Sequence, residues 1–332
     1  MTKEKKLRIG LTFLITIAFL LLLFLYSINT GSVELSMRQL FRGLFVEYDP
    51  SVATVYDLRF PRILVALLAG SALAVSGTML QSVMKNPLTD PGIIGISSAA
   101  AMVGSMTMFF LPEYYFLSPL FSIFGGLLAY FLIYTLAWDG GVRPVRLILV
   151  GVALNMTFVG ISDGVKSMLG ANLTQTQAII EGNVVQKTWA DVKILAVYVG
   201  LFLLISLFTI KTCNLLTLED KTAKSLGVNV NRDRFLIALI AIILASITTS
   251  VVGVIGFVGL LVPHIGRLLV TGDHKFLIPY SAILGATLLL FSDTAGRVIA
   301  YPFEIKASIM MAIIGGPFFI LLLRAGGKDY GN

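Results

Sequence analysis

The sequence contains few of the residues that build disulfides, metal sites and charged protein surfaces. Among 332 residues there are one cysteine, two histidines and two tryptophans, and only 13% of the residues are charged. A single thiol, Cys213, cannot form an internal disulfide and has no second thiol beside it for a metal, so we expect it to be a small buried apolar side chain. With only His264 and His274 and no cysteine pair, transfer of bare metal ions or haem iron from ligand to ligand is poorly supported. Any metal that the protein handles is expected to be chelated already.

The motifs of several enzyme classes are also missing. The chain contains no H-E-x-x-H, no G-x-S-x-G and no P-loop G-x-x-x-x-G-K-[ST], and its one Gly-Lys pair, Gly327-Lys328, is followed by Asp329. We therefore expect no catalysis by this chain, and neither a cofactor nor a metal bound to it.

Apolar residues are present in excess. They make up 57% of the chain, and the mean hydropathy is +0.90, whereas soluble domains are about 45–50% apolar and about 25% charged. These values predict an all-α polytopic membrane protein and argue against disorder, nucleic-acid binding and secretion. Because most of the predicted loops are short, we expect a single transmembrane domain over residues 1–332.

The transmembrane segments are predicted from the absence of charge, because a central Asp, Lys or Arg costs about 2.5–3.5 kcal/mol on insertion. Nine windows lack Asp, Glu, Lys and Arg: residues 9–33, 63–84, 91–112, 114–138, 147–162, 194–210, 235–266, 276–292 and 307–323. The seventh would form a helix of about 48 Å, longer than the hydrocarbon core of about 30 Å. We expect it to break near Gly253, Gly256 and Gly259, into segments at about 233–251 and 256–269. The prediction is therefore ten transmembrane helices.

The distribution of basic residues predicts the orientation of the chain. With ten spans both termini share a side, and placing the N-terminus in the cytoplasm puts sixteen of the 25 lysines and arginines on the cytoplasmic side. Both termini are therefore expected to be cytoplasmic. The first apolar run, Ile9 to Val33, is too long for a signal h-region and is expected to stay as an uncleaved helix. Two long external stretches, about 29–60 and 163–193, and one cytoplasmic loop, about 211–234, result.

Arginines gather at the predicted external ends of two segments. The stretch LRFPR at residues 58–62 precedes the second segment, and Arg297 follows the ninth. Arg59 and Arg62 are explained either as cations that snorkel to the interface at a helix start or as part of a patch for an acidic partner, since arginine binds carboxylates bidentately. Arg297 either joins that patch or pairs with Asp293 at i,i+4.

A turn is predicted at residues 86–92, on the cytoplasmic side of the second segment. The sequence there is Asn-Pro-Leu-Thr-Asp-Pro-Gly, and two prolines and a glycine forbid a continuous helix. Small residues such as Gly77 and Gly104 on either side of it favour close helix packing in lipid.

The loop of residues 216–228 predicts a short amphipathic helix outside the membrane. Thr217 and Asp220 resemble an N-cap box, and Gly227 supplies a C-terminal stop. Such a helix either rests on the membrane surface or presents its apolar face to a cytoplasmic protein.

Taken together, these stretches resemble the FecCD-type permeases of bacterial ABC importers for iron-siderophore complexes, cobalamin and haem. The matching stretches are LRFPR at 58–62, QSVMKNPLTDPGIIGIS at 81–97, LEDKTAKSLG at 218–227, GVIGFVGLLVPHIGRLLVTGDHK at 253–275, DTAGR at 293–297 and IGGPFFILLLR at 314–324. The resemblance extends from the second segment to the C-terminus, and the ordered combination is far more specific than any one stretch.

The resemblance implies a type II ABC importer permease fold with ten helices in a bacterial cell membrane. It also implies four kinds of partner: a second permease subunit, identical or paralogous; two ATPase subunits, which bind ATP and Mg; an extracytoplasmic substrate-binding protein; and the lipid membrane. By position, the resemblance assigns docking of the binding protein to Arg59, Arg62 and Arg297, coupling to the ATPase to Leu218, Glu219, Ala223, Leu226 and Gly227, and a cytoplasmic gate to Asn86, Leu88, Pro144 and Val145.

The cargo implied by the resemblance is an iron-siderophore complex, with haem or cobalamin as alternatives. A membrane channel or sensor outside the ABC class is a further alternative, which association with an ATPase through the 216–228 loop would exclude. The sequence departs from the family pattern at residues 180–183 and 304–308. Both stretches are predicted to be external, where altered docking or substrate recognition is expected.

Overall fold

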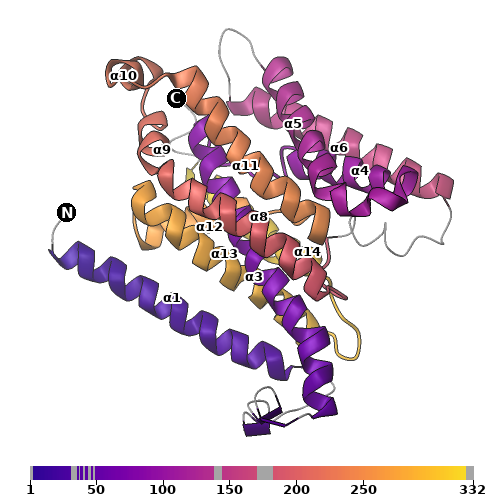
Figure 1. Ribbon diagram of the computed structural model, residues 1–332. Coiled ribbons are helices and arrows are strands. Elements are labelled where there is room, and N and C mark those ends of the chain that lie inside the picture. Colours follow the sequence, from indigo (N-terminus) through magenta and orange to yellow (C-terminus); the bar gives the residue numbers. More distant parts are fainter. Residues whose placement is uncertain are drawn as a thin grey trace.

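The structure, a computed structural model, describes residues 3–30, isolated positions between 36 and 49, and residues 50–137, 144–169 and 182–326. Within these ranges every regular element is a helix (Figure 1). The helices are α1 (Lys3–Asn29), α3 (Pro50–Met84), α4 (Ile96–Phe110), the 3-10 helix η1 (Pro112–Leu117), α5 (Ser118–Ala137), α6 (Pro144–Leu169), α8 (Trp189–Phe208), α9 (Ile210–Leu216), α10 (Asp220–Ser225), α11 (Val230–Val252), α12 (Val258–Leu269), α13 (His274–Ile299) and α14 (Ala307–Gly326).

Seven of the described helices are long and apolar enough to cross a membrane: α1, α3, α5, α6, α8, α11 and α13. Three further apolar stretches, Ile96–Thr107, Val258–Leu269 and Ala307–Leu321, are shorter than the about 20 residues that a straight span needs. The predicted class, an all-helical multi-pass membrane protein, is confirmed. The number of ten crossings stays a prediction.

Helix α3 begins much earlier than the charge-free window suggests. It starts at Pro50, and the carboxylate of the N-cap residue Asp49 accepts a hydrogen bond from the Ser51 amide at 2.8 Å. The interpretation of residues 58–62 as a helix start is therefore wrong, whereas the predicted membrane window of residues 63–84 lies inside the helix and stays a prediction. A window without charges ends at Arg59 and Arg62, whereas the helix continues through both because their side chains find partners inside the protein.

The predicted break in the seventh window is confirmed. Helix α11 ends at Val252, and Gly253 has φ +75°, a left-handed conformation that glycine adopts without steric cost. Residues 253–257 are not helical, and α12 begins at Val258. The chain therefore divides one apolar run of residues between a long helix and a short one.

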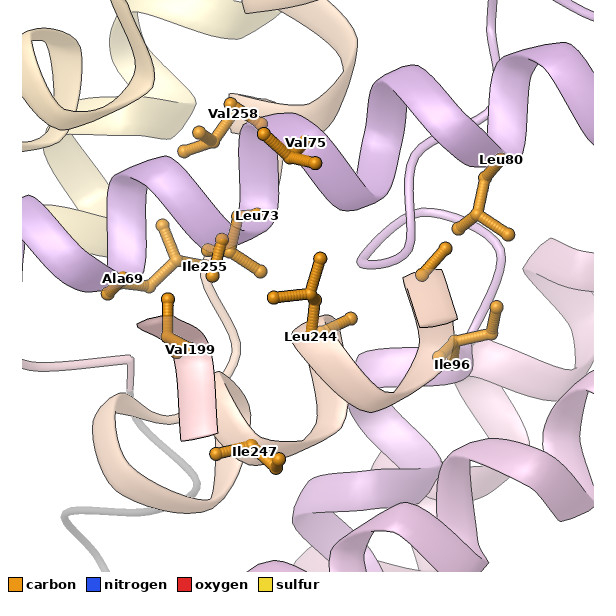
Figure 2. Close-up of a cluster of buried hydrophobic side chains, with 14 of the residues drawn as sticks. Ala69, Leu73, Val75, Leu80, Ile96, Val199, Leu244, Ile247, Ile255 and Val258 are labelled. Carbon is orange, nitrogen blue, oxygen red and sulfur yellow. The ribbon is translucent and has the colours of Figure 1, made fainter. Parts of the chain in front are cut away.

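Helix α3 lies at the centre of the molecule, where it packs against α8, α11, α12 and α13, and α11 in turn packs against α4 and α5 (Figure 1). A Cβ on Gly70 would lie 2.2 Å from the carbonyl oxygen of Gly285 in α13, and one on Gly77 would lie 2.1 Å from that of Gly259 in α12. The backbones touch because neither side has a side chain. Figure 2 shows the apolar cluster around this helix, where Leu73 of α3 lies close to Ile255 and Leu244.

The outer helices keep most of their apolar surface exposed in the single chain. Only 17% of the most apolar 18-residue window of α1 or α6 is buried, against 78% for α3. Such apolar helix faces are suited to contact with lipid or with another protein subunit.

Candidate functional site

Residues 210–228, which we call the α9–α10 arm, leave the end of α8 and return to α11. Helix α10 has only six residues, and Glu219 at its N-cap makes no side-chain capping bond. The hydroxyl of Thr217 instead donates to the carbonyl oxygen of Asn214 at 2.7 Å. The predicted N-cap box of Thr217 and Asp220 is therefore wrong. The predicted stop is present, because Gly227 has φ +84° and its amide donates to the Lys224 carbonyl at 3.0 Å.

The five residues assigned to ATPase coupling divide into two groups. Leu218 and Leu226 are 39% and 58% exposed, and Glu219 and Gly227 are also exposed. Ala223 is 1% exposed and packs in the main apolar core. The exposed surface of α10 therefore excludes Ala223, and we correct its assignment from a contact with a partner to a contact that seats α10 on its own chain.

Asp220 connects the α9–α10 arm to two transmembrane helices. Its Oδ1 lies 2.5 Å from Nζ of Lys85, the residue that follows α3, and 2.8 Å from Nη2 of Arg234 in α11. The hydrogen bond from Lys85 and the adjacent Arg234 hold the pKa of Asp220 below its usual value. The carboxylate is thus negatively charged at neutral pH and is held between two cations.

The predicted turn at residues 86–92 is confirmed, and its polar groups are turned inward. Asn86 is 3% exposed, and its Oδ1 accepts from the Leu88 amide at 2.9 Å, while its carbonyl accepts from the Thr89 amide at 3.2 Å. Asp90 is 1% exposed and accepts from the amides of Gly92 and Ile93 at 2.8 and 3.0 Å. Leu88 is half-buried. The turn is thus a defined structure in which Leu88 is the more accessible of the two predicted gate residues.

Gln81 holds this turn against α12. Its Nε2 donates to the carbonyls of Gly259 at 3.1 Å and Thr89 at 3.3 Å, and its Oε1 accepts from Arg267 at 2.5 Å. A buried amide with both ends bonded specifies one position for the segment it holds. The other two predicted gate residues, Pro144 and Val145, occupy the first turn of α6, and their side chains lie outside the described part of the chain.

The three arginines assigned to docking come together at the opposite end of the molecule. We call them, with Asp293 and Glu304, the arginine cluster. Arg62 contacts Asp293 through Nη2 at 2.8 Å and through Nε at 3.0 Å, and its Nη1 contacts Glu304 at 2.9 Å. Arg297 lies 3.5 Å from the same Asp293 at i,i+4. The predicted i,i+4 pairing of Arg297 with Asp293 is therefore present, and the three arginines lie together, while a patch for an acidic partner stays a prediction.

The cluster also binds the end of α1. Arg59 donates to the carbonyl of Ile28 at 2.7 Å, and Arg297 donates to the carbonyls of Ser27 at 3.3 Å and Thr30 at 3.1 Å. These carbonyls belong to the last turn of α1 or to the residue after it. At the end of a helix no later helical amide is available to donate to such carbonyls. Two of the arginines therefore cap α1 as well as carrying charge.

Exposure differs among the three arginines. Arg62 and Arg297 are each 7% exposed in the single chain, whereas Arg59 is half-buried. The three arginines and Glu304 line a cavity of about 1040 Å³ together with residues such as Gln186 and Tyr301. A ligand or partner that enters this cavity meets these four side chains, while Asp293 lies buried behind them.

Sequence reasoning missed several residues that organise these regions: Gln81, Lys85, Asp90, Asp220, Arg234 and His274. Lys85 and Asp220 are 135 positions apart, and periodicity in a single sequence carries no signal for a contact of that range. Lys85 and Asp90 nevertheless lie inside the quoted stretch of residues 81–97, so that a search for polar residues beside the predicted turn would have found them. No cluster of three or more His, Cys, Asp or Glu that could hold a metal ion occurs among the described residues.

The arrangement of helices defines the class of protein. The chain superimposes on a solved metal-chelate type ABC transporter in an inward-facing conformation with a TM-score of 0.78 and 29% identity, over 95% of this chain and 99% of that one. PsaBC from Streptococcus pneumoniae, solved with a Fab, superimposes with a TM-score of 0.59 at 18% identity over 87% and 95% of the two chains, which shows a shared fold. The fold is that of a type II ABC importer permease.

Sequence comparison gives the family. The FecCD transport family matches residues 19–325, and this chain belongs to it. The chain is 42% identical over 324 residues, 97% of each chain, to a heme-iron transport system permease protein, IsdF, from Staphylococcus aureus strain RF122, and 41% identical over the same lengths to IsdF from strain MW2. The predicted family and the predicted class, an ABC importer permease, are therefore confirmed.

Proposed function

We propose that this chain is the permease subunit of a haem importer, which forms with a second permease subunit the path for iron porphyrin across a bacterial cell membrane. One observation carries the choice of cargo: the relatives named heme-iron permeases are 42% identical over 97% of the chain. The aligned 324 residues cover 97% of the chain and so include the membrane segments that line any path. A large chelate also suits the described part of the chain, in which no metal-ligand cluster occurs, since the iron stays coordinated by its porphyrin.

The energy for transport comes from partner ATPases in this proposal. The sequence contains no phosphate-binding loop, so this subunit supplies a path and a surface on which an ATPase acts. The proposed contact surface consists of the exposed Leu218, Glu219, Leu226 and Gly227 on the α9–α10 arm. This arm and both chain termini are placed in the cytoplasm.

The turn of residues 86–92 is the proposed cytoplasmic gate, with Leu88 as the residue that faces the path. The arginine cluster is the proposed docking region for an extracytoplasmic binding protein, with Arg59 as the most accessible arginine. The three arginines and two carboxylates of the cluster carry a net charge of +1. This positive charge favours an acidic partner surface.

A ferric siderophore complex is the second candidate cargo. The solved transporter that resembles this chain at 29% identity over 95% of its length is described as metal-chelate type, and that description covers siderophores as well as porphyrins. A cobalamin importer, a passive channel and a sensor have no comparable observation in their favour.

Uptake by whole cells tests the proposal. A strain that lacks its own haem and siderophore permeases receives the genes for this chain, its neighbouring ATPase and its binding protein, and uptake of radiolabelled haemin and of a ferric hydroxamate is measured. We expect haemin uptake that disappears when the ATPase carries a substitution in its P-loop lysine. Uptake of the hydroxamate alone would establish the second candidate, and uptake of neither would reject both.

A further inference from the structure

The end of α3 is joined to the α9–α10 arm beside the proposed gate. Lys85 has a left-handed backbone, with φ +49°, and directly precedes Asn86. Its ammonium group donates to the carbonyl of Leu218 and to Oδ1 of Asp220, the latter at 2.5 Å. The side chain of Lys85 thus connects Asp220, the first residue of α10, and Leu218, in the loop before it, to the position that directly precedes the turn.

A second connection lies one helical turn earlier in α3. The hydroxyl of Ser82 lies 2.7 Å from Nε2 of His274, and Nδ1 of this histidine lies 2.7 Å from Oδ1 of Asn214 in α9. The same Asn214 oxygen accepts from the His274 amide at 2.9 Å. His274 is 2% exposed, so that these bonds are shielded from water and hold α9 to α3 firmly.

The α9–α10 arm is therefore joined to the end of α3 in two ways: directly by Leu218 and Asp220, which bond Lys85, and indirectly by Asn214, which bonds His274 of α13. Its ion pair with α11, between Arg234 and Asp220, does not involve α3. A displacement of α10 that leaves these contacts intact must carry the last turn of α3 with it. Since Asn86 follows Lys85 in the chain, the turn of residues 86–92 is the next segment to move.

We propose that Lys85 is a positioning residue that transmits motion of the α9–α10 arm to the turn of residues 86–92, and so links the ATPase to the gate. This inference rests on the proposed function. The ion pair is partly exposed, with the side chains of Lys85 and Asp220 31% and 47% accessible, and pairs of that kind contribute little to folding stability. Loss of Lys85 is therefore expected to disturb coupling while the chain still folds.

The structure offers a matched pair of variants to separate coupling from stability. Lys85→Met and Arg234→Met each remove one cation from Asp220, but only the first removes the direct bonds between the α9–α10 arm and the residue that ends α3. Lys85→Arg keeps the charge and the donors. Lys85→Gln, which keeps a donor for the Leu218 carbonyl without the charge, serves as the second variant if Lys85→Met does not accumulate in membranes.

The experiment uses the complete complex with its ATPase in proteoliposomes, with ATP hydrolysis and labelling of a Leu88→Cys reporter as the two readouts. The native thiol does not interfere, because burial raises the pKa of Cys213 to about 11 and the parent chain gives the background. We expect the maleimide labelling rate at position 88 to change between the nucleotide-free and vanadate-trapped complexes. In Lys85→Met that change shrinks by about fivefold or more, while ATP hydrolysis continues. Arg234→Met and Lys85→Arg retain most of the change.

Two results overturn the inference, and they are distinguishable from failure of the proposed function. If Lys85→Met keeps the full nucleotide-dependent change at position 88, the connection does not transmit motion. If the parent chain binds the ATPase but position 88 never responds, the turn is not the element that moves. If the parent chain does not bind the ATPase at all, the proposed function fails first and the inference fails with it.

Discussion

At the scale of single residues, the arginine cluster shows how buried charges are accommodated. Asp293 has a side chain 1% accessible and contacts two arginines whose side chains are 9% and 6% accessible. Removal of one member of a buried ion pair leaves an uncompensated charge, which costs far more than the intact pair contributes. Asp293 therefore determines whether Arg62 and Arg297 are tolerated in the helices at all.

We predict that Asp293→Asn destabilises the folded protein by about 3–5 kcal/mol, because two buried guanidinium groups lose their shared carboxylate. Glu304→Gln is the matched control, since this carboxylate is 43% accessible and its loss is expected to cost about 1 kcal/mol or less. Thermal unfolding of both purified variants in detergent measures the difference. Equal midpoints for the two variants would show that the buried pairing is not what stabilises this end of the molecule.

At the scale of helices, the sequence predicts those features that depend on residues close together in the chain. The absence of charge locates the helices, and Gly253 places the break between α11 and α12, because glycine alone adopts φ +75° cheaply. The start of α3 cannot be predicted in this way, because Arg59 and Arg62 indicate the end of a membrane segment unless their partners on α1 and α13 are known. The joining of Lys85 to Asp220 was not predictable for the same reason, since the partner comes from a different helix.

Close contact between helices gives a prediction that distinguishes one glycine from another. Gly70→Ala places a methyl group 2.2 Å from the backbone oxygen of Gly285, so that α3 and α13 must separate, at a cost of about 1–3 kcal/mol. Gly200→Ala in α8 meets nothing within 4 Å and is expected to be neutral or stabilising by up to about 1 kcal/mol. Thermal unfolding in detergent compares the two. A Gly70→Ala protein as stable as the parent would mean that the α3–α13 contact relaxes freely.

At the scale of the whole molecule, two polar regions lie at opposite ends of one helix. Helix α3 carries Arg59 and Arg62 near its start, and Lys85 follows its last residue (Figure 1). The arginine cluster and the α9–α10 arm are thus connected through α3, which is the most buried of the seven described helices long enough to cross a membrane, with 78% of its apolar window inside. A continuous central helix of this kind allows a displacement at one end to affect the other. A role in transport requires that the two ends face opposite sides of the membrane.

That arrangement predicts opposite accessibility of the two ends. Lys224→Cys lies on exposed α10, and Tyr301→Cys replaces a side chain 72% exposed beside the arginine cluster. In intact spheroplasts, a membrane-impermeant maleimide is expected to label position 301 and not position 224, because the distribution of Lys and Arg predicts that α10 is cytoplasmic. After permeabilisation both positions label, and the parent chain, with its buried Cys213, remains the unlabelled control. Labelling of position 224 in sealed spheroplasts would reverse the orientation and place the α9–α10 arm where no ATPase can reach it.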